Sequence, residues 1–137
     1  MSLVLDASLT LSWFIPDEHR PELQIVLDLV EQQGAVVPDF WRLEVGNALL
    51  LATRRRRIGS QLLQDAFDGL EALPITVDVD ASLTAWTSTF ELATRFNLTL
   101  SDACYLELAK RRQLPLATLD RELRRAAKAA NVELLGG

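Results

Sequence analysis

The sequence predicts an α/β fold with a mostly parallel sheet. Short apolar runs alternate with longer segments of helical periodicity, which is the pattern of βαβ units. Hydrophobic residues make up 49% of the chain and charged residues 24%, which is the balance of a globular protein. A chain of 137 residues fits one compact domain that can bury about two thirds of its surface.

Each expected strand is a run of apolar or β-branched residues bounded by Gly, Pro or polar residues, and each expected helix shows helical periodicity. In chain order the predicted strands cover 3–6, 35–37, 74–77, 115–118 and a short segment 132–134. The predicted helices cover 9–14, 17–33, 39–55, 60–73, 81–97, 101–112 and 121–130.

The helix predicted over 17–33 has the clearest signals. Leu23, Val26 and Val30 are spaced to form one apolar stripe that can lie on the sheet. Gly34 follows at the position where glycine commonly ends a helix. Because no internal repeat, low-complexity tract or domain boundary interrupts the pattern, we expect residues 1–137 to form one domain.

The net charge of −5 argues against a surface that attracts nucleic acid as a whole. A polyanion would have to be met locally, by guanidinium groups that bind phosphate with planar, permanently charged forks. The first candidate is the run Arg54, Arg55, Arg56 and Arg57, and further arginine pairs stand at 111–112 and 124–125. A run of charges is equally compatible with a solvated helix face.

Cysteine content and hydropathy exclude several classes of protein. Cys104 is the only cysteine, so neither an internal disulfide nor a thiolate metal cage is expected, and a reducing cytoplasm fits. The N-terminus lacks a basic segment before its short apolar run, and no stretch of 18 apolar residues occurs. We therefore expect a cytoplasmic protein with no membrane association.

Two aspartates follow predicted strands. Asp6 ends the first strand and Asp120 comes shortly after the strand at 115–118, so both are expected at the carboxyl edge of the sheet, where open α/β folds bind ligands. The alternative for each is structural, because Asp is a preferred N-cap residue and a helix follows both positions. Ser8 is a further candidate for capping the first helix.

Glu44 lies on a helix face that looks apolar, with Trp41 before it and Ala48 after it. An unpaired carboxylate there would lose several kcal/mol of hydration, so it should be protonated, paired or bound to a cation. Arg42 is at the wrong helical spacing to pair with it. Asn47, one turn further, is placed to orient the same site.

Asp102 stands at the start of a helix whose remainder reads as largely buried. With Thr99 it could form a capping box, which is a purely structural use. The functional interpretation is that Asp102 projects into the crevice that Asp6 and Asp120 share.

Four carboxylates in one crevice would repel one another unless hard cations such as Mg²⁺ or Mn²⁺ neutralised them. Zinc is disfavoured because His19 is the only histidine, and we expect it at the surface. Oxygen-liganded ions of this kind suit hydrolysis of phosphodiester bonds. No dinucleotide-binding, P-loop or nucleophile-elbow motif competes with this interpretation.

Four short motifs together resemble the PIN domain, and more narrowly the VapC-type toxins of toxin–antitoxin modules. They are Leu-Asp-Ala-Ser at 5–8, Glu44 with Asn-Ala-Leu at 47–49, Ser-Asp-Ala-Cys-Tyr-Leu at 101–106 and Ala-Thr-Leu-Asp at 117–120. The resemblance implies a three-layer α/β/α sandwich with an acidic site of Asp6, Glu44, Asp102 and Asp120. Asp6 and Asp102 are then the first candidates for metal ligands, with the Ser8 and Thr118 hydroxyls beside them.

The resemblance also implies an activity and partners. Such proteins are endoribonucleases that cut tRNA, rRNA or mRNA and are inhibited by a cognate antitoxin protein, and many are homodimers. The aromatic and aliphatic side chains at 13–15 are candidates for an antitoxin contact, although such a run is more often part of a core.

Two alternatives stay open. A phospho-acceptor receiver module has similar length and fold class, but it needs neighbouring acids after the first strand and a lysine at a late strand end. Here Ala7 follows Asp6, and both lysines lie within predicted helices. The other alternative is a non-catalytic, partner-binding α/β domain whose acids serve only as helix caps.

Overall fold

The computed structural model describes residues 2–137, whose five strands form one sheet in the order β3-β2-β1-β4-β5. The strands are β1 (Leu3–Leu5), β2 (Ala35–Pro38), β3 (Ile75–Asp78), β4 (Leu116–Ala117) and β5 (Leu134–Leu135). All four pairings between neighbours are parallel, so every strand ends at the same edge of the sheet. The predicted α/β class is confirmed, and the sheet is wholly parallel.

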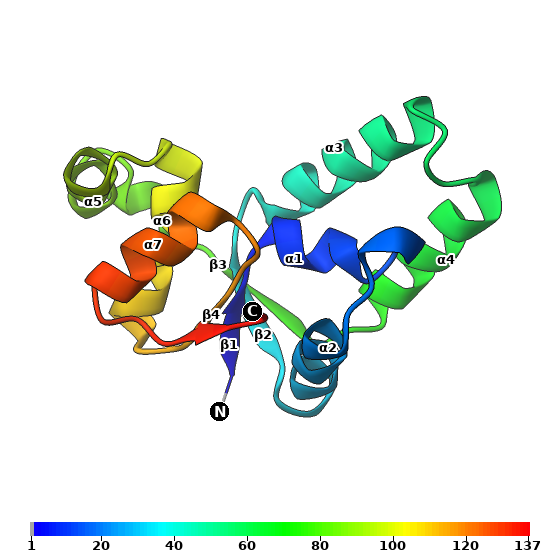
Figure 1. The fold of residues 1–137 in the computed structure, drawn as a ribbon. Helices are drawn as coiled ribbons and strands as arrows, with labels where there is room; N and C mark the ends of the chain where they lie inside the picture. The colour runs from blue at the N-terminus through cyan, green and yellow to red at the C-terminus, as the bar shows by residue number, and fades with distance from the viewer. Residues whose placement is uncertain (1) are drawn as a thin grey trace.

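Helices lie on both sides of this sheet, as Figure 1 shows, with the first four on one side and the last three on the other. They are α1 (Ala7–Ser12), α2 (Pro21–Gln33), α3 (Trp41–Arg54), α4 (Ser60–Glu71), α5 (Ser88–Phe96), α6 (Leu100–Arg112) and α7 (Arg121–Ala129). This arrangement confirms the expected three-layer sandwich. No helix within residues 2–137 is long and apolar enough to cross a membrane.

The core is built around β1, the central strand. Val4 pairs with Val36 of β2 and with Leu116 of β4, and all three residues of β1 are buried. A parallel strand that is covered on both faces needs an uninterrupted apolar run, which explains Leu-Val-Leu at this position. The chain therefore becomes polar only where β1 ends, at Asp6.

The helix predicted over 17–33 is interrupted. A short 3₁₀ turn, η1 (Pro16–Glu18), comes first, and α2 begins only at Pro21. Arg20 is extended, with φ −141° and ψ 152°, because a residue before proline is disfavoured in the α region, and Pro21 then takes the first helical position. At the other end Gly34 has φ 79°, which confirms its predicted role in ending the helix.

The helix predicted over 81–97 is also two elements, the 3₁₀ turn η2 (Ala81–Thr84) and α5. The hydroxyl of Thr84 donates to the carbonyl oxygen of Ala81, and that of Thr87 donates to the carbonyl oxygen of Thr84. Such side-chain hydrogen bonds compete with the helical ones, which accounts for the break between the two elements.

The remaining predicted boundaries are displaced by one or two residues. Asp6 lies outside the strand predicted over 3–6, and the first helix begins at Ala7 instead of residue 9 and ends at Ser12. Shifts of one or two residues also affect the segments predicted at 35–37, 39–55, 60–73, 74–77, 101–112, 115–118, 121–130 and 132–134. End residues are decided by capping and local hydrogen bonds, which periodicity does not resolve.

Candidate active site

Asp6 lies directly after β1, at the carboxyl edge of the sheet. Its side chain is buried, and its Oδ2 accepts hydrogen bonds from Ser8 Oγ at 2.7 Å and from Thr118 Oγ1 at 2.6 Å. Asp6 occupies the N-cap position of α1, yet its side chain makes no capping hydrogen bond. The two hydroxyls predicted beside Asp6 are therefore in contact with its carboxylate.

Asp120 caps the helix that follows it, as its structural alternative predicted. Its Oδ1 accepts a hydrogen bond from the backbone nitrogen of Leu123 at 2.9 Å, so it caps α7. Its own backbone nitrogen donates to Thr118 Oγ1 at 3.0 Å, the hydroxyl that also donates to Asp6. Thr118 thus joins the segments that follow β1 and β4.

Glu44 lies in the first turn of α3 and is half-buried. Its Oε1 accepts a hydrogen bond of 2.6 Å from the hydroxyl of Tyr105, whose side chain is fully buried. The Tyr105 ring meets Phe40 edge-on, with centroids 5.7 Å apart, which fixes its direction. The sequence left open whether Glu44 was protonated, paired or bound to a cation. Among residues 2–137 its carboxylate has one hydrogen-bond partner, the phenol hydroxyl of Tyr105.

Tyr105 is the site residue that sequence reasoning missed, because its motif was used only for the resemblance. The available signal was its spacing, since residues three apart share a helix face and Tyr105 follows Asp102 by three. A tyrosine in an otherwise apolar helix also needs a hydrogen-bond partner for its hydroxyl when buried.

Asp102 lies in the first turn of α6 and is half-buried. Its backbone nitrogen donates to Thr99 Oγ1 at 3.2 Å, so the predicted cap at Thr99 forms. That hydrogen bond uses the backbone of Asp102 and not its carboxylate. The structural and functional interpretations of this segment are therefore compatible.

The four carboxylates act on one another electrostatically. Burial raises the pKa of Asp6 above its usual range, the Thr118 and Ser8 hydrogen bonds oppose the rise, and the charge of Asp120 adds to it. Burial likewise raises the pKa of Glu44, against the hydrogen bond from Tyr105, and the charges of Asp6 and Asp102 contribute.

Asp102 shows the same effect. Burial, followed by the charges of Asp120 and Asp6, raises its pKa to about 6, although Thr99 opposes the rise. Residues distant in sequence are thus close enough for their charges to disfavour one another, as the crevice hypothesis requires.

The residues present fit a hard divalent cation held by few protein ligands. Carboxylates are the preferred ligands of Mg²⁺, which usually keeps several waters and uses one or two carboxylates. Among residues 2–137, no three acidic, histidine or cysteine side chains are placed to ligate one ion together. An all-protein cage is therefore excluded in this conformation, whereas binding through Asp6 and Asp102 with water is compatible with it.

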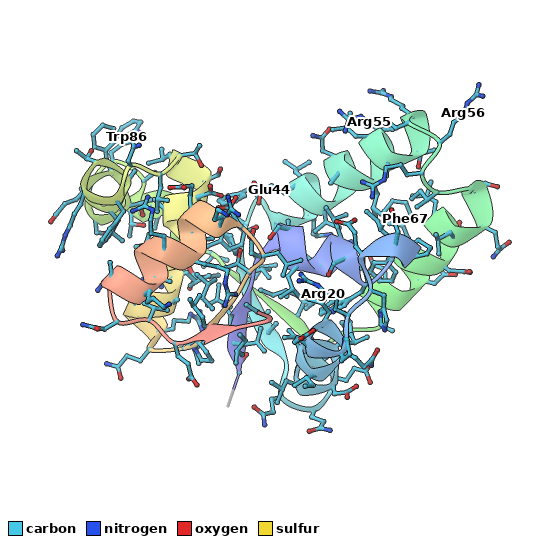
Figure 2. All side chains as sticks on the ribbon, in the orientation of Figure 1. Arg20, Glu44, Arg55, Arg56, Phe67 and Trp86 are labelled. Atoms are coloured by element: carbon cyan, nitrogen blue, oxygen red, sulfur yellow. The ribbon has the colours of Figure 1, made fainter. Side chains whose placement is uncertain are left out.

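Two other groups of predicted residues form no hydrogen bond or ion pair with the four carboxylates among the described residues. Asn47 is exposed, and within the described part of the chain its side chain forms no hydrogen bond with the four acids. Figure 2 shows Arg55 and Arg56 at the far end of α3, whereas Glu44 lies near its start. Arg54 ends the helix.

Arg57 is engaged by other charges, because its Nη2 lies 3.6 Å from Asp17 Oδ1 and 3.4 Å from Glu18 Oε2. With Arg55 it lines a groove of about 310 Å³ between α1 and α3 that reaches Ser8. One end of the arginine run is therefore connected to the site through this groove.

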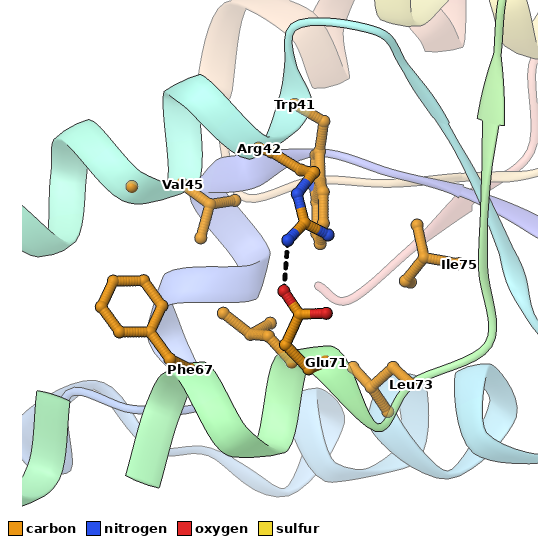
Figure 3. Close-up of a pocket in the computed structure, with 9 residues that line it drawn as sticks. Trp41, Arg42, Val45, Phe67, Glu71, Leu73 and Ile75 are labelled. Carbon is orange, nitrogen blue, oxygen red and sulfur yellow. Dashed lines mark hydrogen bonds and ion pairs between the residues drawn. The ribbon is translucent and has the colours of Figure 1, made fainter. Parts of the chain in front are cut away.

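A second cavity, of about 210 Å³, lies between α3 and α4 and is lined by none of the four carboxylates. Figure 3 shows Arg42 of α3 paired with Glu71 of α4 across it, with Val45 and Phe67 to the left of the pair. Trp41 also lines it, and its buried Nε1 has no hydrogen-bond partner among the described residues.

The segment at 13–15 belongs to the core. Ile15 is buried, and Trp13 and Phe14 pack partly buried against the core residues. The indole Nε1 of Trp13 donates to the carbonyl oxygen of Leu23, which ties this segment to α2. His19 is exposed, as expected.

Comparisons with known proteins agree with this architecture. A family model described as PIN domain matches residues 3–129. The chain is 28% identical over 127 residues to Ribonuclease VapC3 of Pyrobaculum aerophilum. The aligned region covers 90% of this chain and 92% of that protein.

Two solved structures have a similar fold. PAE2754 from Pyrobaculum aerophilum has a TM-score of 0.66 and 21% identity, covering 98% of this chain and 83% of that one. FitAcB from Neisseria gonorrhoeae has a TM-score of 0.60 and 18% identity, covering 98% of this chain and 96% of that one.

Proposed function

The chain belongs to the PIN domain family, and from this premise we propose that it is a divalent-metal-dependent endoribonuclease. The observation that carries the proposal is the convergence of Asp6, Glu44, Asp102 and Asp120, three of which have raised pKa values. Carboxylates that disfavour one another cost stability, and capping does not require the side chains of Glu44 or Asp102, so a catalytic role accounts for them better than a structural one. The name of the ribonuclease relative supports the same reaction class.

The chain's own residues would organise the reaction. Ser8 and Thr118 hold the carboxylate of Asp6, and Tyr105 holds that of Glu44, so both are pre-oriented. Asp6 and Asp102 would hold Mg²⁺ or Mn²⁺, and the ion would supply charge compensation, activation of a water and polarisation of the phosphate. In the reaction water adds to phosphorus and one P–O ester bond breaks, giving a phosphate monoester and an alcohol.

The direct test is cleavage of RNA by the purified protein with Mg²⁺, with Mn²⁺ and with excess chelator. Asp6→Asn and Asp102→Asn should each lose about 100-fold or more of the cleavage rate while staying folded. Asp65→Asn is the matched control, because Asp65 is exposed on α4. This variant should cleave RNA at the wild-type rate. Equal cleavage by wild type and site variants, or cleavage in chelator, would contradict the proposal.

We further propose that the protein is the toxin of a toxin–antitoxin pair that acts on cytoplasmic tRNA, rRNA or mRNA and is inhibited by a cognate antitoxin. The support is the similarity to a protein named Ribonuclease VapC3. Induced expression of the wild type should arrest growth, and expression of Asp6→Asn should not. Arrest by both proteins would point to toxicity unrelated to the site.

A homodimer is part of the same proposal. Exposed apolar side chains occur around η2 and α5, with Leu83 75% and Trp86 90% exposed, and surfaces of this kind mark protein contacts. Sedimentation of the purified protein should give the mass of two chains, and the mass of one chain would contradict this part of the proposal.

A further inference from the structure

The outer face of α7 concentrates positive charge. Four basic side chains at positions i, i+3, i+4 and i+7 share this face, which we call the α7 basic face: Arg121, Arg124, Arg125 and Lys128. Together with Ala129 and Leu134 they line a hollow of about 580 Å³. The opposite side of the helix is buried through Leu123, Ala126 and Ala127, which fixes the helix against the core.

The α7 basic face begins at the active site. Arg121 directly follows Asp120, whose carboxylate caps α7 and whose charge raises the pKa values of Asp6 and Asp102. From there the helix extends away from the end of β1 (Figure 1). At 1.5 Å per residue, Lys128 lies about 10 Å beyond Arg121 along the helix axis. The cations thus form a track that starts beside the carboxylates.

Two of the four cations are held in place by the protein. Arg124 Nη1 donates to the carbonyl oxygens of Thr118 at 2.7 Å and Leu135 at 3.1 Å, and these contacts leave its charge without a carboxylate. Arg125 Nη2 contacts Glu122 Oε2 at 2.7 Å and the carbonyl oxygen of Phe96 at 2.9 Å.

The other two cations are available to a ligand. Arg121 and Lys128 are both exposed, and neither forms an ion pair within residues 2–137. Of the four cations on the α7 basic face, only Arg125 forms an ion pair among the described residues, in a chain whose net charge is −5. Local charge of the opposite sign to the whole protein indicates an anionic ligand.

We propose that the α7 basic face binds the sugar–phosphate backbone of single-stranded RNA and guides it to the side of the site where Asp120 lies. This inference rests on the proposed nuclease function. Cations repeated along a helix match a ligand with regularly repeated charges, and phosphate contacts position a nucleic acid without reading its sequence.

The arginine run at 54–57 is less suited to this role. Arg55 lies roughly 16 Å beyond Glu44 along the axis of α3 at the normal helical rise, and Figure 2 shows it at the far end of that helix. Arg57 is already paired with Asp17 and Glu18. The structure thus favours the basic segment around 124–125 over the run 54–57, which was the first candidate from the sequence.

The test measures binding of a fluorescent single-stranded RNA in chelator as a function of NaCl concentration. The double variant Arg121→Gln, Lys128→Gln removes the two available cations. Each lost phosphate contact should lower the slope of log K against log salt by about 0.7, so a decrease of about 1.4 is expected. The variant Arg121→Lys, Lys128→Arg should retain the wild-type slope, because it preserves both charges.

The matched control is Arg20→Gln, Lys110→Gln, which removes one exposed Arg and one exposed Lys outside the α7 basic face. It should leave the slope unchanged. Equal slopes for the wild type and the α7 variant, or an equal decrease in the control, would overturn the inference. Binding of a polyglutamate peptide to the α7 basic face in place of RNA would also overturn the inference, because the partner would then be an acidic protein.

Cleavage assays with Mg²⁺ on the same proteins separate this inference from the proposed function. If the wild type cleaves RNA while the α7 variant binds it with an unchanged slope, only the role of the α7 basic face is wrong. If the wild type neither binds nor cleaves RNA, the nuclease proposal and this inference both fail.

Discussion

At the scale of single residues, the site depends on hydroxyl groups that hold carboxylates in unfavourable surroundings. Asp6 is 5% exposed and would be costly to ionise without the donors Ser8 and Thr118. Glu44 depends in the same way on the buried hydroxyl of Tyr105. The protein stabilises the negative charge of these carboxylates only partly, so a positively charged ligand could complete the neutralisation.

Tyr105→Phe tests the role of that hydroxyl. The ring and its packing on Phe40 are kept, so the fold should lose only about 1 kcal/mol, the net contribution of one hydrogen bond. Glu44 loses the contact that orients it, and kcat for RNA cleavage should fall about 10-fold with KM nearly unchanged. An unchanged kcat would show that Glu44 needs no positioning by Tyr105.

At the scale of elements, α6 links the site to the edge of the sheet. Its first turn carries Asp102, and its last turn carries Arg111 and Arg112, which bind Asp78 at the end of β3. Arg111 contacts both oxygens of Asp78, at 3.0 and 3.2 Å, and its Nε lies 2.6 Å from Glu107. This network anchors an edge strand that pairs only with β2.

Asp78 is only 1% exposed, and burial by itself would raise its pKa. The hydrogen bonds from Arg111, Arg112 and the backbone nitrogen of Asp80, together with the charge of Arg111, outweigh burial and hold the pKa below its ordinary value. A carboxyl whose folded-state pKa is lowered contributes stability above the unfolded-state pKa, near 3.9, and loses it as the pH falls through the folded-state pKa. The network should therefore stabilise the protein at neutral pH and not in strong acid.

Arg111→Met keeps the aliphatic stem and removes the charge that Asp78 and Glu107 share. At pH 7 the free energy of unfolding should fall by about 3 kcal/mol, the lower end for a broken buried pair, because Arg112 still binds Asp78. Denaturation by urea measures this difference, which should shrink below about pH 4. Lys110→Met, an exposed neighbour, should change stability far less, and an equal loss in both would refute the role of the network.

At the scale of the whole molecule, the parallel sheet brings the site together. Asp6 and Thr118 are separated by 112 positions in sequence, yet they are hydrogen-bonded because β1 and β4 are neighbours and end at the same edge. The other acids come from the first turns of α3 and α6 and from the N-cap of α7. The surface charge is divided in a similar way, since an acidic chain concentrates cations along α7.

Metal binding should stabilise the whole fold, because an ion that binds only the folded protein shifts the unfolding equilibrium. With Mg²⁺ at 100 times its Kd the gain is about 2.7 kcal/mol, which corresponds to a rise in Tm of several degrees. Asp6→Asn should lose this rise, and Asp65→Asn should keep it. An equal rise in all three proteins, or one reproduced by KCl at equal ionic strength, would argue against an ion at Asp6.

The fold class, the order of the strands along the chain and the positions of the four acids relative to the strand and helix ends could all be predicted from the sequence. These features are local, since apolar periodicity and strand–helix alternation are written in neighbouring residues. The breaks before Pro21 and around Thr87 were missed because a proline constraint and hydroxyl hydrogen bonds interrupted segments that otherwise read as continuous helices.

The sequence alone therefore determined the fold class and identified the four carboxylates as candidate site residues. Only the tertiary structure decided that Asp120 caps α7, that Tyr105 holds Glu44, that Arg111 and Arg112 hold Asp78, and that four cations share a hollow on α7. The physical reason is distance in space: hydrogen bonds, ion pairs and charge repulsion depend on which strand ends and helix faces meet. Residues far apart in the chain meet only once the sheet has formed.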